Sequence, residues 1–335
     1  PTLSYNPIPI FLTYFICSLE QKRNLTDMRM GLFIGGIGSA GSLRSQITQI
    51  LEAEKDGFHS LWAAHIMDVD IMSMMCLAAE KTNRIEMGTA VTPTFLRHPI
   101  AMAQQALTVQ SIAGGRFILG LGVSHKPVVE DRLGMEFHRP ARHMKEYLDI
   151  VRTLSRDGMV DYKGQIFSAN TQFTIVERSH IPVLLAALGP RMLKTAGETA
   201  DGTITWMTGV QTLKNYITPT INRAAEAVGR DKPRVVAAVP VTVTDDRPAA
   251  FRQANDYFGR YGQLPSYRAM LDREGVESPA EMALVGDEEE VEEQLKAYAE
   301  AGVTDIAAQI YPVGSDADES IARTRNLLRS LIGKL

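Results

Sequence analysis

Two histidines stand where an imidazole could take part in catalysis. His65 follows the short apolar run 60–64, and His125 follows the apolar run 116–122. Imidazole exchanges a proton near neutral pH, so either side chain could act as a general acid or base. One histidine after a strand is more often structural, but two such positions favour a site. His125 is our first candidate for donating a proton or orienting a substrate, and His65 is the second.

The segment 188–194, which reads LGPRMLK, has the composition of an anion site. Pro190 suits the first turn of a helix, where backbone N–H groups lack partners within the helix and can bind a phosphate. Arg191 and Lys194 add two cations to that turn, although both could simply be solvated. We therefore predict phosphate contacts from the four residues that open this helix: Leu188, Gly189, Pro190 and Arg191.

The segment 36–41 has the G-x-G-x-x-G spacing of a dinucleotide-binding loop. Such a loop needs an acidic residue at the end of the second strand, where it binds the ribose hydroxyls. This chain has His65 there, and Asp68 and Asp70 come only later. We therefore favour a glycine-rich loop at a barrel mouth, which would let the backbone approach a ligand ring closely.

Composition and missing motifs exclude several function classes. The net charge is −4, from 35 Lys plus Arg and 39 Asp plus Glu, so no positive field favours nucleic acid. The sequence contains no Walker loop, G-x-S-x-G, H-E-x-x-H or C-x-x-C motif, and His138 and His143 have no matching ligands, so we predict no metal site. Only two cysteines occur, Cys17 and Cys76, which fits a reducing compartment. We expect a cytoplasmic protein without a membrane partner.

Residues 28–335 alternate regularly between strand-like and helix-like segments, as in parallel strands joined by helices. No linker or compositional break divides them, which favours one closed barrel over two open sheets. We predict an α/β fold, a single (β/α)8 TIM barrel, with a lid-like insertion after strand 4 and a helical insertion near 264–274 after strand 7. The eight predicted strands are 29–34, 60–64, 85–91, 116–122, 182–188, 202–207, 234–244 and 304–310. The main predicted helices are 42–57, 71–81, 100–112, 140–155, 190–200, 210–228, 249–260, 286–302 and 317–332.

Residues 1–27 contribute no element to this barrel. Their apolar run, 7–19, is broken by prolines, is too short to span a bilayer and lacks the basic start of a signal peptide. The segment is either upstream sequence before a true start at Met28 or Met30, or a small extension that covers one end of the fold. We exclude it from the barrel and expect the barrel to fold without it.

Three long segments resemble a known family: GTAVTPTFLRHPIAMAQQALTVQSIAGGRFILGLGVSHKPVVE (88–130), AALGPRMLKTAGETADGTITWM (186–207) and YGQLPSYRAMLDREG (261–275). Together they are similar to the luciferase-like monooxygenase superfamily, and more narrowly to its branch of coenzyme F420-dependent oxidoreductases. The resemblance covers about residues 29–332. It implies a (β/α)8 barrel with an insertion, in agreement with the strand count.

The resemblance also implies a cofactor, coenzyme F420 or alternatively FMN, at the barrel mouth. Members often have a non-prolyl cis peptide in the third strand, which would fall around Thr89, Ala90 and Val91. The matched phosphate turn is at Gly189 and Pro190. The ring would be bordered by the stretch from Thr205 through Trp206 and Met207. The relatives carry an acidic residue at the position of His125 and an aspartate near that of His65, so this chain departs from them at both.

The implied reaction is hydride transfer between reduced F420 and a small organic substrate. Two alternatives stay open: an FMN-dependent monooxygenase that uses molecular oxygen, and a barrel that binds a deazaflavin or flavin without catalysis. The resemblance is compatible with a homodimer.

Overall fold

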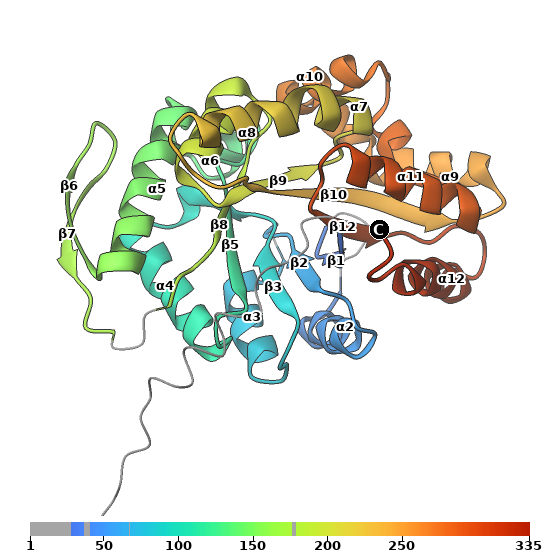
Figure 1. The fold of residues 1–335 in the computed structure, drawn as a ribbon, viewed down its shortest axis with the longest axis horizontal. Coiled ribbons are helices and arrows are strands. Elements are labelled where there is room, and N and C mark those ends of the chain that lie inside the picture. Colours follow the sequence, from blue (N-terminus) through green and yellow to red (C-terminus); the bar gives the residue numbers. More distant parts are fainter. Residues whose placement is uncertain (1–27, 37–40, 67, 176–178) are drawn as a thin grey trace, which may run out of the picture.

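Eight parallel strands form a closed barrel in the computed structural model, which describes residues 28–36, 41–66, 68–175 and 179–335 (Figure 1). The first strand pairs with both the second and the last, and each remaining strand pairs with its two neighbours. The predicted single (β/α)8 barrel is therefore confirmed. The barrel strands are β1 (Arg29–Ile34), β2 (Ser60–Ala63), β3 (Glu86–Thr89), β5 (Phe117–Gly122), β8 (Val183–Ala186), β9 (Gly202–Trp206), β10 (Arg234–Val243) and β12 (Asp305–Ile310).

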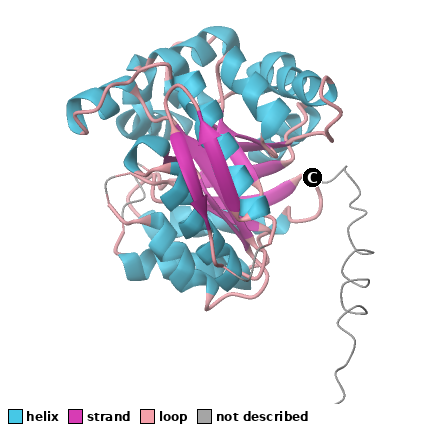
Figure 2. Cartoon of the chain, turned by 90° about the vertical axis from the view of Figure 1, so that its left-hand side faces the viewer, coloured by secondary structure: helices cyan, strands magenta, loops and turns pink. Residues whose placement is uncertain are grey.

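Helices surround the barrel (Figure 2). Several begin at a side chain that accepts a backbone N–H: Ser42, Asp70 and Asp287 each cap a helix in this way. Among the described residues, no helix is long and apolar enough to cross a membrane. The helices are α2 (Leu43–Lys55), α3 (Ile71–Ala79), α4 (Pro99–Ile112), α5 (Pro140–Asp157), α6 (Pro190–Thr199), α7 (Val210–Thr212), α8 (Thr218–Glu226), α9 (Arg247–Phe258), α10 (Pro265–Glu274), α11 (Glu288–Glu300) and α12 (Ala317–Ser330).

The predicted helix 210–228 is wrong as a continuous element, because a π-helical turn at Leu213–Ile217 separates α7 from α8. The predicted strand 85–91 is too long as well. It ends at Thr89, and the two-residue strand β4 (Thr92–Pro93) continues beside β5. The lid-like insertion after strand 4 contains a π-helical turn at Val128–Arg132, and the helical insertion after strand 7 contains α9 and α10.

Three more short strands, besides β4, were not predicted. β11 (Leu284–Gly286) pairs with the far end of β10. β6 (Met159–Lys163) and β7 (Ser168–Gln172) form an antiparallel hairpin beside the barrel, at the left of Figure 1. The carboxylate of Glu146 on α5 anchors the hairpin turn by accepting the backbone N–H groups of 165–167 at 2.8–3.0 Å.

The barrel interior is filled by large side chains. The indole of Trp62 crosses the barrel against Gly88, where an added Cβ would lie 2.2 Å from the ring, and its N–H donates to Ser60 Oγ at 2.9 Å. A layer of apolar residues lies above it, and so the barrel is a packed core rather than a channel. The inward-facing core residues are Phe33, Trp62, Ala64, Ile118, Leu184, Ile204, Val236, Ala238 and Ala307.

Four charged side chains close the end of the barrel where the strands begin. Arg234 lies 2.6 Å from Asp305 and 3.2 Å from Glu86, and Arg29 lies 2.6 Å from Glu86. The Asp305 side chain is fully buried. Burial alone would raise the pKa of Asp305, but Arg234 and Arg29 outweigh that effect and lower it.

This cluster generates a stability prediction. Asp305→Asn should reduce the free energy of unfolding by about 3 kcal/mol, because two arginines then share Glu86 as their remaining carboxylate. Asp256→Asn on the exposed surface of α9 is the matched control and should change it by less than about 0.5 kcal/mol. Urea unfolding of both variants measures the difference, and equal losses would contradict this role for Asp305.

The same cluster predicts a pH dependence. Because folding lowers the pKa of Asp305, its stabilisation is complete above the unfolded value of about 3.9 and is lost as the pH falls through the lower folded value. The stability difference between the wild type and Asp305→Asn should therefore narrow below about pH 4.

Candidate active site

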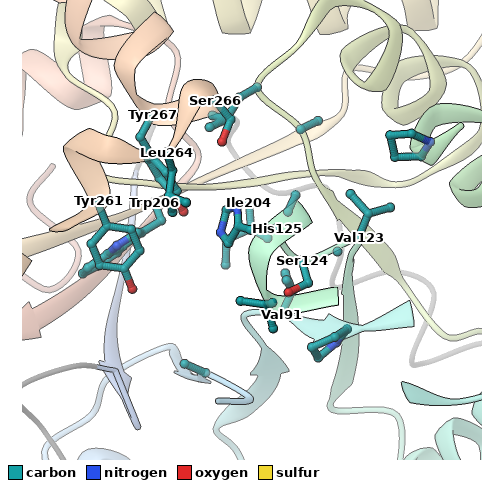
Figure 3. A pocket seen from close by; sticks show the side chains of 18 of the residues that line it. Val91, Val123, Ser124, His125, Ile204, Trp206, Tyr261, Leu264, Ser266 and Tyr267 are labelled. Carbon is teal, nitrogen blue, oxygen red and sulfur yellow. The ribbon is translucent and has the colours of Figure 1, made fainter. Parts of the chain in front are cut away.

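A pocket of about 920 Å³ opens where the barrel strands end. Its walls come from the strand ends, the insertion after β5, the start of α6 and the insertion that contains α10 (Figure 3). A cavity of this size at the carboxyl ends of barrel strands is the usual place for a ligand in this architecture. The volume is large enough for a ring cofactor together with a small second molecule.

The floor of the pocket depends on a close approach of β3 to β5. Thr89 Oγ1 accepts the N–H of Gly120 and donates to its carbonyl, both at 2.8 Å. An added Cβ at Gly120 would lie 1.8 Å from the carbonyl oxygen of Thr89, and one at Gly122 would lie 2.4 Å from Val91 Cγ2. The peptide bond between Ala90 and Val91 is cis, at the position that the resemblance predicts. Ala90 and Val91 line the pocket, whereas Thr89 is buried beneath it.

His125 lies on the pocket wall just after β5. Ser124 has a left-handed φ of 61°, which turns the chain, and the His125 carbonyl accepts the N–H groups of Val128 and Val129 at 2.9 and 3.0 Å. Burial lowers the pKa of His125, so the imidazole is neutral at pH 7. Its ring centroid lies 5.7 Å from that of Tyr267.

His65 also lines the pocket, just after β2. Burial lowers its pKa, and the nearby guanidinium of Arg97, which is ion-paired with Asp70, lowers it further. Its Nδ1 is buried without a hydrogen-bond partner among the described residues. A buried polar atom without a partner is costly, so this nitrogen is suited to a polar atom of a ligand.

The predicted phosphate turn borders the pocket. Leu188, Gly189, Pro190 and Arg191 all line it, and α6 begins at Pro190. The last three are exposed, and an added Cβ at Gly189 would meet nothing within 4 Å. Lys194 is ion-paired with Glu198 and does not line the pocket. Of the two predicted cations, only Arg191 is therefore placed to contact a ligand.

Trp206, at the end of β9, forms another wall. Its ring stacks on that of Phe33 with centroids 5.1 Å apart and an interplanar angle of 15°. Met207, the next residue, has a left-handed φ of 49° and is buried away from the pocket with Phe258. The structure thus brings Trp206 to the cavity surface and places Met207 behind it.

The sequence analysis missed the part of the wall that comes from residues 259–267. A 3₁₀-helix at Gly259–Gln263 carries Tyr261, and α10 carries Tyr267. Both rings line the pocket (Figure 3). Two tyrosines six residues apart in an insertion between barrel elements could have indicated this wall, since insertions at the carboxyl ends of strands border the site.

Other candidate motifs do not form a second site. His143 donates or accepts a hydrogen bond with Thr94 Oγ1 at 3.0 Å and stacks on Phe95, and burial lowers its pKa to about 4. No group of three metal-ligating side chains occurs in the described part of the chain. Gly36 of the glycine loop lines the pocket, but residues 37–40 lie outside the described residues, as do residues 1–27.

Comparison with known proteins agrees with this architecture. The family model described as luciferase-like monooxygenase matches residues 28–305. The chain belongs to the luciferase-like monooxygenase family. This match includes seven of the barrel strands and the start of the eighth, and it contains every described residue that lines the pocket.

Proteins that this chain is similar to include both F420-dependent and FMN-binding ones. An F420-dependent glucose-6-phosphate dehydrogenase of Amycolatopsis mediterranei is 29% identical over 280 residues, which are 82% of this chain and 76% of that protein. The structure of an F420-dependent secondary alcohol dehydrogenase has a TM-score of 0.77 at 20% identity and covers 90% of this chain and 98% of that one. The FMN complex of the oxygenating constituent of 3,6-diketocamphane monooxygenase from Pseudomonas putida has a TM-score of 0.69 at 17% identity, covering 92% and 97%. Both structures support the shared fold.

The phosphate turn generates a binding prediction. Arg191→Ala should weaken cofactor binding by about 1 to 3 kcal/mol, the range for losing a charge-assisted hydrogen bond, and should make binding less sensitive to salt. Lys194→Ala, whose side chain is already paired with Glu198, is the matched control and should have less effect. Titration at two salt concentrations measures both. Unchanged affinity in the Arg191 variant would move the anion site elsewhere.

Proposed function

We propose that this protein is a coenzyme F420-dependent oxidoreductase that transfers a hydride between the deazaflavin and a small organic substrate. One observation carries the proposal: an apolar floor, an exposed helix start with an arginine, and a neutral histidine surround a single pocket. The apolar floor suits a flat ring, the helix start with its arginine suits the phosphate, and the histidine suits a reacting substrate. The F420-dependent relative at 29% identity supports the choice of deazaflavin.

The residues present fit such a cofactor. Ala90 and Val91 offer an apolar surface for a ring, and the absence of a side chain at Gly122 leaves room for Val91. The buried Nδ1 of His65 has no partner in the described part of the chain and can bind a polar atom of the ring. The N–H groups at the start of α6 and the guanidinium of Arg191 can hold the phosphate.

The protein's chemical task is to position the two reactants and to manage one proton. Coenzyme F420, when bound, supplies or accepts the hydride. A half-buried, neutral His125 can donate a hydrogen bond to a substrate oxygen, or accept a proton from a hydroxyl group when the reaction runs toward oxidation. The surrounding apolar residues limit the entry of water, which strengthens that interaction.

Two alternative functions predict different results in assays of cofactor binding and turnover. A monooxygenase with the same fold has been solved in complex with FMN, and the same phosphate turn would serve FMN, so an oxygen-using enzyme is the second candidate. A barrel that binds the cofactor without turnover is the third.

Cofactor binding and turnover test the proposal directly. We expect purified protein titrated with F420 to bind more tightly than with FMN, and to oxidise reduced F420 in the presence of a panel of enones. Oxygen consumption with reduced FMN would support the monooxygenase instead. Cofactor binding without any turnover would support the silent barrel.

His125 generates a kinetic prediction. His125→Ala should lower the rate of hydride transfer by about 10² to 10⁴ while cofactor affinity stays nearly unchanged. His125→Glu, which restores the acidic residue of the resembling enzymes, should recover part of the rate with an altered pH profile. Pre-steady-state transfer and the melting temperature are measured together, because a purely structural histidine would lower the melting temperature alone. A normal transfer rate in His125→Ala would leave His65 as the candidate.

A further inference from the structure

One side of the pocket is an almost continuous set of aromatic rings. The ring of Tyr267 lies 5.7 Å from His125 and 5.1 Å from Tyr261, and the ring of Tyr261 lies 6.0 Å from Trp206. Trp206 in turn stacks on Phe33. We call Tyr261, Tyr267 and Trp206 the aromatic wall. Figure 3 shows this wall on one side of His125, with Val91 on another.

The aromatic wall is held in place by its own packing. Tyr261 and Tyr267 meet edge to face at an interplanar angle of 70°, and Trp206 meets Tyr261 at 66°. The ring of Phe258, at the end of α9, packs edge-on against Trp206 at 77°. The wall therefore joins the strand end of β9 to the insertion, and all three of its rings line the cavity.

The charged side chains among the described residues that line the pocket are all exposed. The two histidines that line it are half-buried, and burial lowers the pKa of each, so they are neutral at pH 7. Among the described lining residues, those that are half-buried or buried therefore include no side chain with a fixed charge. The exposed charged residues are Asp131, Arg132, Arg191 and Arg260.

We propose that the substrate is an uncharged molecule with a flat, apolar body, that it packs against the aromatic wall, and that Tyr267 is the residue that positions it beside His125. This proposal deepens the proposed function and rests on it for the reaction. A charged substrate group would lose its hydration beside these half-buried and buried residues without gaining a partner. An aromatic or conjugated body gains both apolar burial and ring contact.

A matched pair of ligands tests the substrate class. Benzylideneacetone is uncharged, and trans-cinnamate has nearly the same shape with a carboxylate in place of the methyl ketone. Isothermal titration calorimetry with protein that holds the oxidised cofactor requires no turnover. We expect benzylideneacetone to bind at least tenfold more tightly than cinnamate. Equal or tighter binding of cinnamate, or of glucose 6-phosphate as a second anionic probe, would overturn the proposal.

Substitutions test the positioning role of Tyr267. Tyr267→Ala should raise the dissociation constant of benzylideneacetone at least tenfold, whereas Tyr267→Phe, which keeps the ring, should stay within threefold of the wild type. Tyr257→Ala is the control, because Tyr257 lies on α9 in the same insertion but does not line the pocket. The affinity of Tyr257→Ala for benzylideneacetone should match that of the wild type.

A readout on His125 separates positioning from general destabilisation. Removal of the Tyr267 ring lets water reach the imidazole, so the pKa of His125 should rise toward its ordinary value of about 6.5. Nuclear magnetic resonance of protein with labelled histidine measures this pKa, and the spectrum of His125→Ala assigns the signal. An unchanged pKa together with unchanged affinity in Tyr267→Ala would overturn the positioning role.

The cofactor assignment and the substrate class can fail separately. If the protein binds FMN rather than F420, the same calorimetry is done with FMN-loaded protein, and with unloaded protein if it binds neither. Failure of the proposed function would appear as absent F420 binding or absent hydride transfer. Failure of the present proposal would appear as a preference for the anionic ligand.

Discussion

The close contact between Thr89 and Gly120 is the constraint on which the mouth of the barrel depends. It brings the end of β3 against β5, because Gly120 has no side chain and the Thr89 hydroxyl satisfies both of its backbone groups. The chain can then continue through Ala90 to place Val91 above Gly122, and the floor of the pocket results. A methyl group at Gly120 would separate the two strands and remove that floor.

The same strand that supports the floor also places His125. β5 ends at Gly122, and the left-handed turn at Ser124 directs the next residue onto the pocket wall. Below this level Trp62 fills the barrel, and the charge cluster around Asp305 closes the opposite end. Most of the residues that stabilise the barrel are therefore separate from those that line the pocket. His65 Nδ1, which has no hydrogen-bond partner among the residues that the structure describes, lies at the mouth rather than in the core.

The parts of the structure that follow from local sequence could be predicted. Each barrel strand is a short apolar run and most helices carry a cap or an initial proline, so the order of elements was readable, as were the mouth positions of His65, His125 and Arg191. The hairpin β6–β7 was missed because its sequence is largely polar and its turn is held by a distant carboxylate, that of Glu146. Local sequence contains no sign of such a contact.

The tyrosines of the insertion show why the proposed substrate wall is harder to predict from sequence than the proposed phosphate turn. The proposed phosphate turn is a local motif, because the glycine, the proline and the first turn of α6 are consecutive residues. Tyr261 packs on Trp206, which is more than fifty residues earlier in the chain, and Tyr267 packs on Tyr261 and on His125. These contacts depend on how the insertion packs against the strand ends. Insertions can change without disturbing the strands, so enzymes on this barrel can share a cofactor turn while their substrate walls differ. The family resemblance therefore predicts a class of cofactor, whereas the substrate must be inferred from the wall that this chain itself builds.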